Sequence, residues 1–588
     1  MKYKTIIPNN MSLAAAKEEN LLFVDKTRYI DWLENDSRTN AAVFLRPRRF
    51  GKTFFIILLK SYYDRALKQH FDRNFAGTWI GSHKTSKASS YFCLDLDFSD
   101  VSSQPGDVCE SFMFSLASSL KRFSWSYPGL EIPVEKLEPG LYKKPSELMT
   151  FFLENFNQAM MKAPEDARGS LYVLIDEYDH FANEVLSRDK DEFKRITSTS
   201  NENEGFIKQF YACLKKYYGG VPGKPIGRFF ITGVSSVSLN SITSGFNIAT
   251  NISDMPGCSA MVGLTHGELS GVIDETVDFS RLNGVSKSEL METMERLYDG
   301  YVFSCGNSES VFNTTMCLGY LNEVITSGSL VSGMPHSIIE SDAGMLEGMM
   351  RLADDGVVDS IADRIFSRQS LAANPPVSLN LNQSDHFDFS EMVSLLKYLG
   401  FISFAPGNEQ NSPALNYQCP NEVYYQIFLK YFEDRRGFKN GIFAKLKDMA
   451  SEKADISPLL ENVEKIISDL PDTGFSGFNE KTLQMCFDFA LRSDPDGKLR
   501  PYLELDTGAH GRVDVLVMNS SIHGRNFLFE LKYLPKGKSS AEAVSAKLAE
   551  AKAQLLQYRI APRIKSVPRL DCWAVVFEGG AATAAEKV

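Results

Sequence analysis

The chain has 588 residues, a formal net charge of −11 at pH 7 and a hydrophobic fraction of 43%. That length predicts three or four domains, at roughly 100–200 residues each. The acidic balance argues against a general polyanion-binding protein, although it leaves room for local basic grooves. The N-terminal residues lack the apolar core of a signal peptide, and no apolar run reaches the roughly 18–20 residues of a membrane span.

The nine cysteines are scattered without a C-x-x-C pair, and the eight histidines are equally dispersed. This spacing suits neither a disulfide framework nor a zinc site, and the odd number of cysteines fits a reducing compartment. We therefore expect a cytoplasmic protein that makes no contact with a membrane.

The first stretch that indicates function begins with residues 41–45, a short apolar run that predicts a strand. A compact basic loop follows, and Gly51-Lys52-Thr53 then opens an apolar segment of helical length. This order is typical of a phosphate-binding loop, where backbone N–H groups converge on an anion. Lys52 would reach the outer phosphates, and the Thr53 hydroxyl would bind Mg²⁺. The alternative is an ordinary basic turn, because the pattern expects glycine where this chain has Arg46.

A second apolar run, residues 171–175, ends in Asp176 and Glu177. Five apolar residues in succession predict a strand buried on both faces, as in a parallel sheet. Acids at the carboxyl end of such a strand lie where open α/β sheets bind ligands. Asp176 would hold Mg²⁺ through water, and Glu177 would polarise the water that attacks the γ-phosphate. The alternative is a strand that stops in a solvated acidic turn.

Strands and helices alternate through this half of the chain, which predicts a mostly parallel sheet covered by helices. Residues 187–204 are instead rich in charge, Ser, Thr and Asn, and predict an exposed excursion. The expected strands are 91–97 and 228–234, and the expected helices are 107–123, 146–162 and 206–218.

Together these motifs resemble AAA-ATPase-like proteins that carry a C-terminal nuclease-like domain. The resemblance implies an ATP site that includes Arg48, Arg49 and Phe50 as well as the Gly51-Lys52-Thr53 turn. It also implies that Thr232 senses the γ-phosphate, although Thr232 fits a plain strand end equally well. Arg46 and Arg228 are further candidates for phosphate contacts. The motifs that carry the resemblance are Phe23-Val24-Asp25-Lys26-Thr27, Arg46-Pro47-Arg48-Arg49-Phe50-Gly51-Lys52-Thr53, Asp176-Glu177-Tyr178-Asp179, Ile231-Thr232-Gly233-Val234-Ser235 and Tyr298-Asp299-Gly300-Tyr301 with Phe303.

The sequence pattern changes in the middle of the chain, where helical periodicity extends from about residue 264 to about residue 355. Residues 356–385 are rich in Asp, Ser and Asn, contain two adjacent prolines and predict a linker or loop. An amphipathic helix at 389–399 and two short strands after it suggest a winged-helix-like unit. Such units often bind DNA, but the scarcity of basic residues here favours packing between domains.

The last part of the chain contains a second candidate site. A strand at 511–517 begins with Gly511-Arg512-Val513-Asp514, and a strand at 526–532 contains Glu530 and Lys532. Residues two apart on a strand leave the same face, so Glu530 and Lys532 project together. Asp514, Glu530 and Lys532 form the acid, acid and lysine pattern of the PD-(D/E)xK nuclease fold. The two carboxylates would hold one or two Mg²⁺ ions, and the metal and the lysine would activate water.

Other residues are candidates for the same site. The helix expected at 541–558 carries Gln554 and Tyr558 on one face, and it resembles the Gln-x-x-x-Tyr helix that covers the site of RecB-like nucleases. Glu480 or Glu504 could be the additional acid found before the core in many members. The alternative is structural, because Phe-Glu-Leu-Lys is a common strand ending and Asp514 could cap a turn.

The sequence thus predicts an α/β protein with three parts: a P-loop AAA-like ATPase domain at 1–262, a helical and winged-helix-like region at 263–450, and a restriction-endonuclease-like PD-(D/E)xK domain at 455–588. The favoured function is an ATP-binding and ATP-hydrolysing protein coupled to a Mg²⁺-dependent nuclease, with DNA rather than RNA as its partner. The resemblance points to mobile-element or defence biology, and a homo-oligomer would let an arginine from a neighbouring copy complete the ATP site. Two alternatives stay open: a nucleotide-dependent switch whose last domain binds nucleic acid without cleaving it, and an assembly protein with a structural nucleotide site.

Overall fold

The computed structural model contains two compact units, one of residues 1–357 and 371–425 and one of residues 358–370 and 426–588. None of the helices in the described parts of the chain is both long and apolar enough to cross a membrane. The structure describes residues 3–6, 19–104, 106–197, 205–235, 248–282, 284–306, 309–331, 336–366, 369–374, 386–409, 412–436, 446–468, 478–492, 498–507, 511–519, 524–537 and 540–588.

The first unit is built on a five-stranded, fully parallel sheet in the order β2-β3-β4-β1-β5. Every residue of β1 and β3 is buried, as expected for strands covered on both faces. The predicted parallel α/β sheet is therefore confirmed, and its strands end at one shared edge, where such sheets bind ligands. The strands are β1 (Ala41–Leu45), β2 (Phe92–Asp97), β3 (Leu171–Asp176), β4 (Ile226–Gly233) and β5 (Thr250–Asn251).

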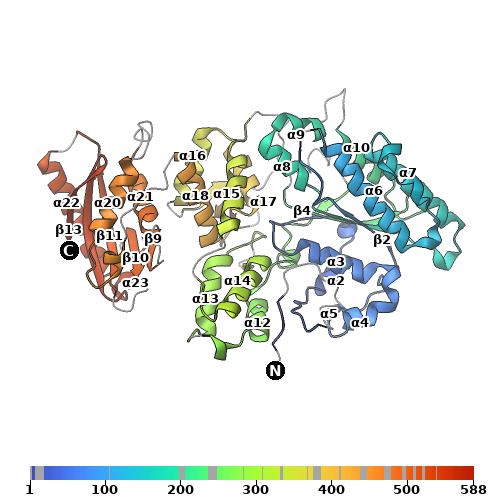
Figure 1. Ribbon diagram of the computed structural model, residues 1–588, viewed down its shortest axis with the longest axis horizontal. Coiled ribbons are helices and arrows are strands. Elements are labelled where there is room, and N and C mark those ends of the chain that lie inside the picture. Colours follow the sequence, from blue (N-terminus) through green and yellow to red (C-terminus); the bar gives the residue numbers. More distant parts are fainter. Residues whose placement is uncertain are drawn as a thin grey trace. The chain divides into compact units, whose positions relative to one another are not determined.

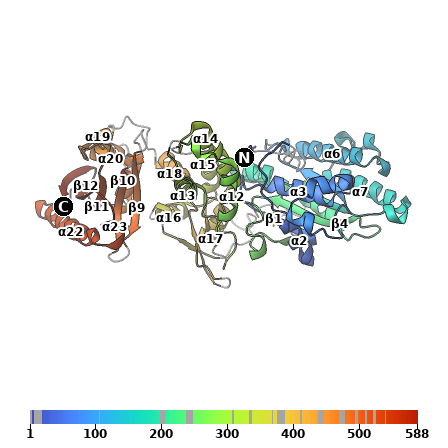
Figure 2. The ribbon, with the colours of Figure 1, turned by 90° about the horizontal axis from the view of Figure 1, so that it is seen from below.

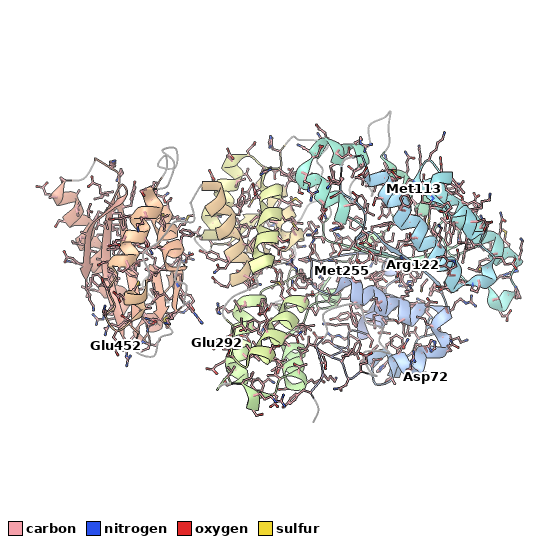
Figure 3. All side chains as sticks on the ribbon, in the orientation of Figure 1. Asp72, Met113, Arg122, Met255, Glu292 and Glu452 are labelled. Carbon is pink, nitrogen blue, oxygen red and sulfur yellow. The ribbon has the colours of Figure 1, made fainter. Side chains whose placement is uncertain are left out.

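Helices cover both faces of this sheet (Figure 1). One face carries α2 (Arg28–Asn35) and α3 (Lys52–Tyr63), and the other carries α6 (Val108–Ser126), α7 (Pro145–Lys162) and α10 (Phe206–Lys216). Met113 and Arg122, which Figure 3 labels, both belong to α6, and Met113 is among the buried residues of that helix. Two short helices, α4 (Phe71–Phe75) and α5 (Trp79–Ser82), follow α3.

The prediction that residues 187–204 form an exposed excursion is wrong for the first part of this range. α8 (His180–Arg188) and α9 (Lys190–Thr197) occupy it, and Phe193 and Ile196 are buried. These two apolar residues are three apart and share one helix face, while the charged residues that suggested a loop take the solvent side. Residues 198–204 lie outside the described parts of the chain.

The middle of the chain is helical as predicted. α12 begins with a capping box in which Thr265 and Glu268 bond each other's backbone N–H groups. α17 is followed by the antiparallel pair of β7 and β8, the predicted helix and two strands. The elements are α12 (His266–Thr276), α13 (Lys287–Tyr298), α14 (Thr314–Ser327), α15 (His336–Met350), α17 (Phe389–Leu399), β7 (Ser403–Phe404) and β8 (Leu415–Gln418).

The linker predicted at residues 356–385 needs correction. α16 (Asp355–Phe366) covers its start, and β6 (Leu371–Ala373) pairs with β8 to complete a three-stranded sheet in the order β6-β8-β7. In α16, Val358, Ile361 and Ile365 are buried at helical spacing, so its acidic residues belong to the opposite face and do not break the helix. Residues 375–385, with both prolines, lie outside the described residues.

The second unit contains a five-stranded sheet in the order β13-β12-β11-β10-β9. Neighbouring strands are antiparallel except β11 and β12, which are parallel because α22 connects them. One core contains residues of α20 and α21 on one face, and a second contains residues of α22 and α23 on the other (Figure 2). The elements are α18 (Glu422–Arg436), α19 (Lys447–Ala450), α20 (Ser457–Ser468), α21 (Glu480–Arg492), β9 (Leu499–Asp506), β10 (Arg512–Asn519), β11 (Asn526–Leu534), α22 (Ala541–Arg559), α23 (Pro562–Lys565), β12 (Leu570–Glu578) and β13 (Ala581–Lys587).

Arg46, which directly follows β1, is buried and connects separate segments of the first unit. Its guanidinium donates hydrogen bonds to the carbonyl oxygens of Leu45 at 2.9 Å, Ser253 at 2.7 Å and Cys258 at 3.1 Å. It also lies 4.4 Å and 4.1 Å from the ring centroids of Phe44 and Phe303. Arg46 thus joins the end of β1 to two later segments, and the expectation that it contacts phosphate is wrong.

Arg228 is the second arginine that the structure removes from the candidates for phosphate contacts. It is buried in β4, donates to the Leu33 carbonyl oxygen at 2.9 Å and lies beside the rings of Tyr63 and Tyr172. A short apolar strand with one arginine does not show, in sequence alone, whether the charge serves a ligand or the fold.

The role of Arg46 can be tested with Arg46→Lys, which keeps the charge and removes the planar fork. An ammonium cannot serve three carbonyl groups in this geometry or stack between two rings, so the free energy of unfolding of the first unit should fall by about 2–4 kcal/mol. Differential scanning calorimetry of the whole chain measures the loss. Arg48→Lys, in the same loop but only half-buried, is the matched control, and an equal loss in both variants would contradict the assignment.

Candidate nucleotide site and candidate nuclease site

The loop between β1 and α3 reverses direction through two residues with left-handed backbone. Arg49 has a φ of 71° and Gly51 a φ of 96°. Glycine adopts this conformation without the steric cost that a Cβ atom brings, which explains its place directly before α3. The turn sets Lys52 and Thr53 at the first positions of the helix.

The carbonyl groups of this loop are held from outside by the start of α14. The Arg48 carbonyl accepts from Asn313 Nδ2 at 3.2 Å, and the Arg49 carbonyl accepts from the Thr315 N–H at 3.0 Å. The Phe50 carbonyl accepts from the Thr314 hydroxyl at 3.0 Å. Because the C=O and N–H of a trans peptide point in opposite directions, the N–H groups that follow these carbonyls point away from α14. The loop therefore presents successive N–H groups, as an anion-binding turn does.

Phe50 anchors the same loop through its side chain. Its ring packs edge-on against Tyr301 at 4.8 Å and Phe303 at 5.3 Å between centroids. Tyr301 and Phe303 belong to the later of the sequence motifs, so two motifs about 250 residues apart in the chain (Phe50 and Tyr301) form one aromatic cluster under the loop. Aromatic pairs of this kind add roughly 0.5–1.5 kcal/mol each beyond their buried area.

A cavity of about 500 Å³ opens beside the loop. Its polar end is lined by Arg49, Lys52, Thr53, Asp176 and Glu177, the residues of the two predicted motifs. Residues 21–24 and 261–264, which are mostly apolar, line another part, so the segment before Lys26 lies at this cavity. A polar end with phosphate-loop residues and an apolar wall suit a nucleotide.

Lys52 is nearly enclosed at the polar end. Its ammonium donates to the carbonyl oxygens of Arg46 and Pro47, both at 3.1 Å, and lies 3.8 Å from Glu177 Oε1. Lys52 therefore sits between the loop and the acidic end of β3. This is the place from which a phosphate-loop lysine reaches outer phosphates.

Asp176 is buried and fixed. Its Oδ1 accepts hydrogen bonds from the Thr232 hydroxyl and from the Glu177 N–H. Burial raises the pKa of Asp176, and hydrogen bonds from the hydroxyls of Thr232 and Thr53 act in the opposite direction. Thr53, Asp176 and Thr232 thus form one connected group, and Thr53 and Asp176 are the pair that would hold Mg²⁺ in a P-loop site.

The side chains of the two loop arginines, Arg48 and Arg49, lie at different cavities. Arg49 lines the cavity and pairs with Asp342 of α15, with its Nη1 2.7 Å from Asp342 Oδ2. Arg48 lines a different cavity, of about 340 Å³, where its Nη2 lies 3.3 Å from His180 Nδ1. The nucleotide roles assigned to Arg48, Arg49, Phe50 and Thr232 stay predictions. Arg49 and Phe50 line the cavity, whereas Arg48 lines the other cavity and Thr232 is fully buried against Asp176.

The second candidate site is assembled in the other unit. β10 places Asp514 and β11 places Glu530 and Lys532, and all three are largely buried. Asp514 is fixed by two donors, the Leu531 N–H at 2.6 Å and Gln484 Nε2 at 2.7 Å. Lys532 donates to Glu530 Oε1 at 2.9 Å. The structure therefore brings together the acid, acid and lysine of the sequence pattern.

Gln484, on α21, is a site residue that no sequence motif indicated. Besides Asp514, its Nε2 donates to Glu504 Oε1 at 2.9 Å, so one buried amide holds two carboxylates. The signal in the sequence is its position one helical turn after Glu480, on the same helix face. Glu480 acts electrostatically on both Glu530 and Lys532, so Glu480 and Glu504 both lie near the site.

The electrostatics of this site fit a divalent cation. Burial, and then the charge of Asp514, raises the pKa of Glu530 to about 8, while burial raises the pKa of Asp514 to about 6. The second carboxylate oxygen of Glu530, Oε2, is buried and has no hydrogen-bond partner among the residues that the structure describes. In the described part of the chain no three acidic, His or Cys side chains converge as a complete ligand set. An ion here would take its other ligands from water or substrate oxygens, as Mg²⁺ commonly does.

α22 lies against the site through one face. Glu550 Oε1 is 3.8 Å from the Lys532 ammonium. Burial, and then the charges of Glu530 and Asp514, raises the pKa of Tyr558 to about 12. Gln554, between these two residues on the same face, has a buried Oε1 with no hydrogen-bond partner in the described parts of the chain. The predicted Gln-x-x-x-Tyr face is thus next to the site, and the role of Gln554 stays a prediction.

Family models match the two regions of the chain that contain the candidate sites. Residues 11–243 match the family model described as "Predicted AAA-ATPase" of AAA-ATPase-like proteins, and residues 504–587 match a model of the PD-(D/E)XK nuclease superfamily. The resemblance drawn from the sequence motifs is therefore confirmed. A search of curated proteins found no match to this chain. The predicted domain limits at residues 262 and 450 stay predictions.

The raised pKa of Glu530 predicts how stability depends on pH in protein stripped of metal by a chelator. Folded Glu530 keeps a proton that the unfolded chain has lost, so the second unit should lose stability as pH rises from about 4.5 to about 8. Glu530→Gln, which cannot ionise, should reduce this slope, leave the part that the raised pKa of Asp514 contributes, and be more stable than the wild type at pH 8. Hydrogen exchange of the β11 amides, corrected for intrinsic rates, measures both. The exposed Glu542→Gln is the matched control, and an unchanged slope in Glu530→Gln would contradict the raised pKa.

Proposed function

We propose that this chain, which combines an AAA-ATPase-like domain with a PD-(D/E)XK nuclease-superfamily domain, hydrolyses ATP in its first unit and cleaves nucleic acid in its second. The observation that carries the proposal is the convergence of Asp514, Glu530 and Lys532 from two adjacent strands. DNA is the proposed substrate rather than RNA. A cytoplasmic location, a homo-oligomer and a role in mobile-element or defence biology stay predictions.

In the first unit, we assign the steps of ATP binding and hydrolysis to three parts of the site. The turned loop and Lys52 bind the phosphates, and Thr53 and Asp176 hold the cation that accompanies them. Glu177 follows Asp176 at the same sheet edge, lines the cavity and orients the attacking water. The close approach of Lys52 to Glu177, at 3.8 Å, supports one shared site for phosphate and water.

In the second unit, a bound Mg²⁺ would act as a Lewis acid and lower the pKa of a water molecule. The protein's own part is to fix the ligands. Leu531 N–H and Gln484 hold Asp514 in one orientation, and Lys532 holds one oxygen of Glu530 while the other oxygen stays available. The Lys532 ammonium also places a positive charge where the phosphodiester gains negative charge.

The alternative is a nucleotide-dependent switch whose second unit binds nucleic acid without cutting it. Its support is the Arg49–Asp342 ion pair, which connects the nucleotide cavity with α15 and gives nucleotide a route to change the fold. The two functions make different predictions for Glu177 and for Lys532, because a switch needs neither residue for chemistry.

The ATPase is tested with Lys52→Ala and Glu177→Gln. Lys52→Ala removes the charge meant for the outer phosphates and should weaken ATP binding by at least about a hundredfold, by roughly 3 kcal/mol. Glu177→Gln should bind ATP as the wild type does and hydrolyse it at least about a hundredfold more slowly. Fluorescent-nucleotide titration and phosphate release measure the two effects. Lys60→Ala, on the same helix with its ammonium 3.2 Å from Asp95, is the matched control.

Two results would count against the assignment of this cavity. Unchanged ATP affinity in Lys52→Ala would remove it as the nucleotide site. Normal turnover in Glu177→Gln would remove Glu177 as the residue that orients the attacking water.

The nuclease is tested by offering single- and double-stranded DNA and RNA with Mg²⁺ or Mn²⁺, with and without ATP. Asp514→Asn and Lys532→Ala should each lower cleavage by at least about a hundredfold, because one loses a metal ligand and the other the charge beside it. Lys552→Ala, on α22 and paired with Glu586 at the surface, should cleave as the wild type does. A wild type that binds but never cuts would favour the switch, and cutting by both site variants would place the activity elsewhere.

A further inference from the structure

The nucleotide cavity contains a third carboxylate, Asp97, which the ATPase motifs do not include. Asp97 is the last residue of β2 and pairs in register with Asp176 of β3. Paired residues of adjacent parallel strands project to the same face of the sheet. Asp97 also lines the same cavity as Asp176 and Glu177. The acidic end of the site is therefore built from two strands.

The direction of the Asp97 side chain follows from its neighbour Asp95. Asp95 Oδ2 lies 3.2 Å from the Lys60 ammonium of α3, so Asp95 faces that helix. Asp97, two residues later on the strand, leaves the same face. Since α3 begins with Lys52 and Thr53, Asp97 faces the side of the sheet on which the phosphate loop lies.

Hydrogen bonds hold the backbone carbonyl and one carboxylate oxygen of Asp97, and its other carboxylate oxygen is available. Its Oδ1 accepts from the Ser99 N–H at 2.9 Å, and its carbonyl oxygen accepts from the Ser115 hydroxyl at 2.7 Å. The following residue, Phe98, donates its N–H to the Asp176 carbonyl oxygen at 3.2 Å, which ties the ends of the two strands together. Within the described residues, Asp97 Oδ2 has no hydrogen-bond partner, and the side chain is half-buried at the cavity wall.

We propose that Asp97 acts with Glu177 to orient the water that attacks the γ-phosphate, an inference that rests on the proposed ATPase function. β2 is the edge strand, one strand farther than β3 from β1 and its loop, so Asp97 lies on the far side of Asp176 from Lys52. Two carboxylates accept the two O–H groups of one water, which leaves a lone pair directed at phosphorus.

The chemical step is balanced without a further reactant. The water oxygen forms the new bond to the γ-phosphorus, and the bond from that phosphorus to the bridging oxygen breaks with its electron pair leaving on ADP. Glu177 takes one proton from the water, and Asp97 keeps the hydrogen bond to the other O–H. Asp97 thus touches the reacting water without accepting its proton.

The test compares Asp97→Asn with Asp95→Asn in the whole chain. Asparagine keeps the acceptor for the Ser99 N–H, so the turn stays intact while the charge is lost. Asp97→Asn should lower kcat for ATP by at least about tenfold and change KM by less than about twofold. Asp95→Asn loses only a surface ion pair with Lys60 and should match the wild type within about twofold.

A binding readout separates orientation of water from a structural effect. ADP with Mg²⁺ and aluminium fluoride mimics the transition state, so Asp97→Asn should weaken this complex about tenfold and leave binding of ADP with Mg²⁺ unchanged. Equal losses for both complexes would show a structural role and overturn the inference.

Combination with Glu177→Gln supplies the decisive comparison. If both carboxylates hold one water, the double variant should turn over within about twofold of Glu177→Gln alone. A double variant slower by the full product of the two single effects would overturn the inference, as would an Asp97→Asn variant with wild-type turnover. A wild type that hydrolyses no ATP would instead reject the proposed function, and the inference with it.

Discussion

The candidate nucleotide site depends on how the carbonyl groups of one loop are held. A phosphate-binding turn must direct several N–H groups to one point, and in this chain Arg46 stands where the pattern has its first glycine. The hydrogen bonds from Asn313, Thr314 and Thr315 fix the loop carbonyls from outside, and the planar peptide unit then fixes the N–H groups. Flexible glycine is unnecessary in a loop whose backbone is restrained by a neighbouring helix. The loop, α14 and the aromatic cluster around Phe50 therefore hold one another in place. This explains why the loop motif and the motif that contains Tyr301 and Phe303 occur together in this chain.

Both sites rely on acidic side chains that are oriented before any ligand binds. Asp176 is held by Thr232 and the Glu177 N–H, and Asp514 is held by Gln484 and the Leu531 N–H. Fixed donors cost nothing to arrange when the reaction begins, which is the physical basis of catalysis by a rigid site. In the second unit, holding the acidic side chains in place lowers the stability of the fold. Glu530 is buried beside Asp514, and Glu530 Oε2 has no partner within the described structure. A divalent cation placed between the two carboxylates would relieve both effects at once, so ligand affinity and apo-state instability have the same origin.

The sequence was informative wherever local pattern and function coincide. The buried strands, the Gly51-Lys52-Thr53 turn and the strands that present Asp514, Glu530 and Lys532 followed from apolar runs and short motifs. It failed where the partner is distant in the chain. Arg46 looked like a ligand for phosphate because two of its three carbonyl partners come from residues 253 and 258. Gln484 matched no pattern, since its role arises only when α21 packs beside β9 and β10. The strands β12 and β13 were not predicted, and β13 is an alanine-rich segment whose composition does not favour a strand.

Each candidate site is complete within one unit of the described structure. The residues that line the candidate nucleotide cavity lie between positions 21 and 318, and those of the candidate nuclease site lie between positions 480 and 558, so the two candidate sites share no side chain. The chain passes from one unit to the other at residues 357–358, 370–371 and 425–426. α15, whose Asp342 binds Arg49, ends at Met350, and the next helix, α16, begins at Asp355 and contains the first of these crossings. In the proposed nucleotide site, phosphate oxygens would compete with Asp342 for the guanidinium of Arg49, because both are anions that an arginine fork can bind. Arg49 is consequently the residue at which the nucleotide cavity meets the segment that leads to the second unit.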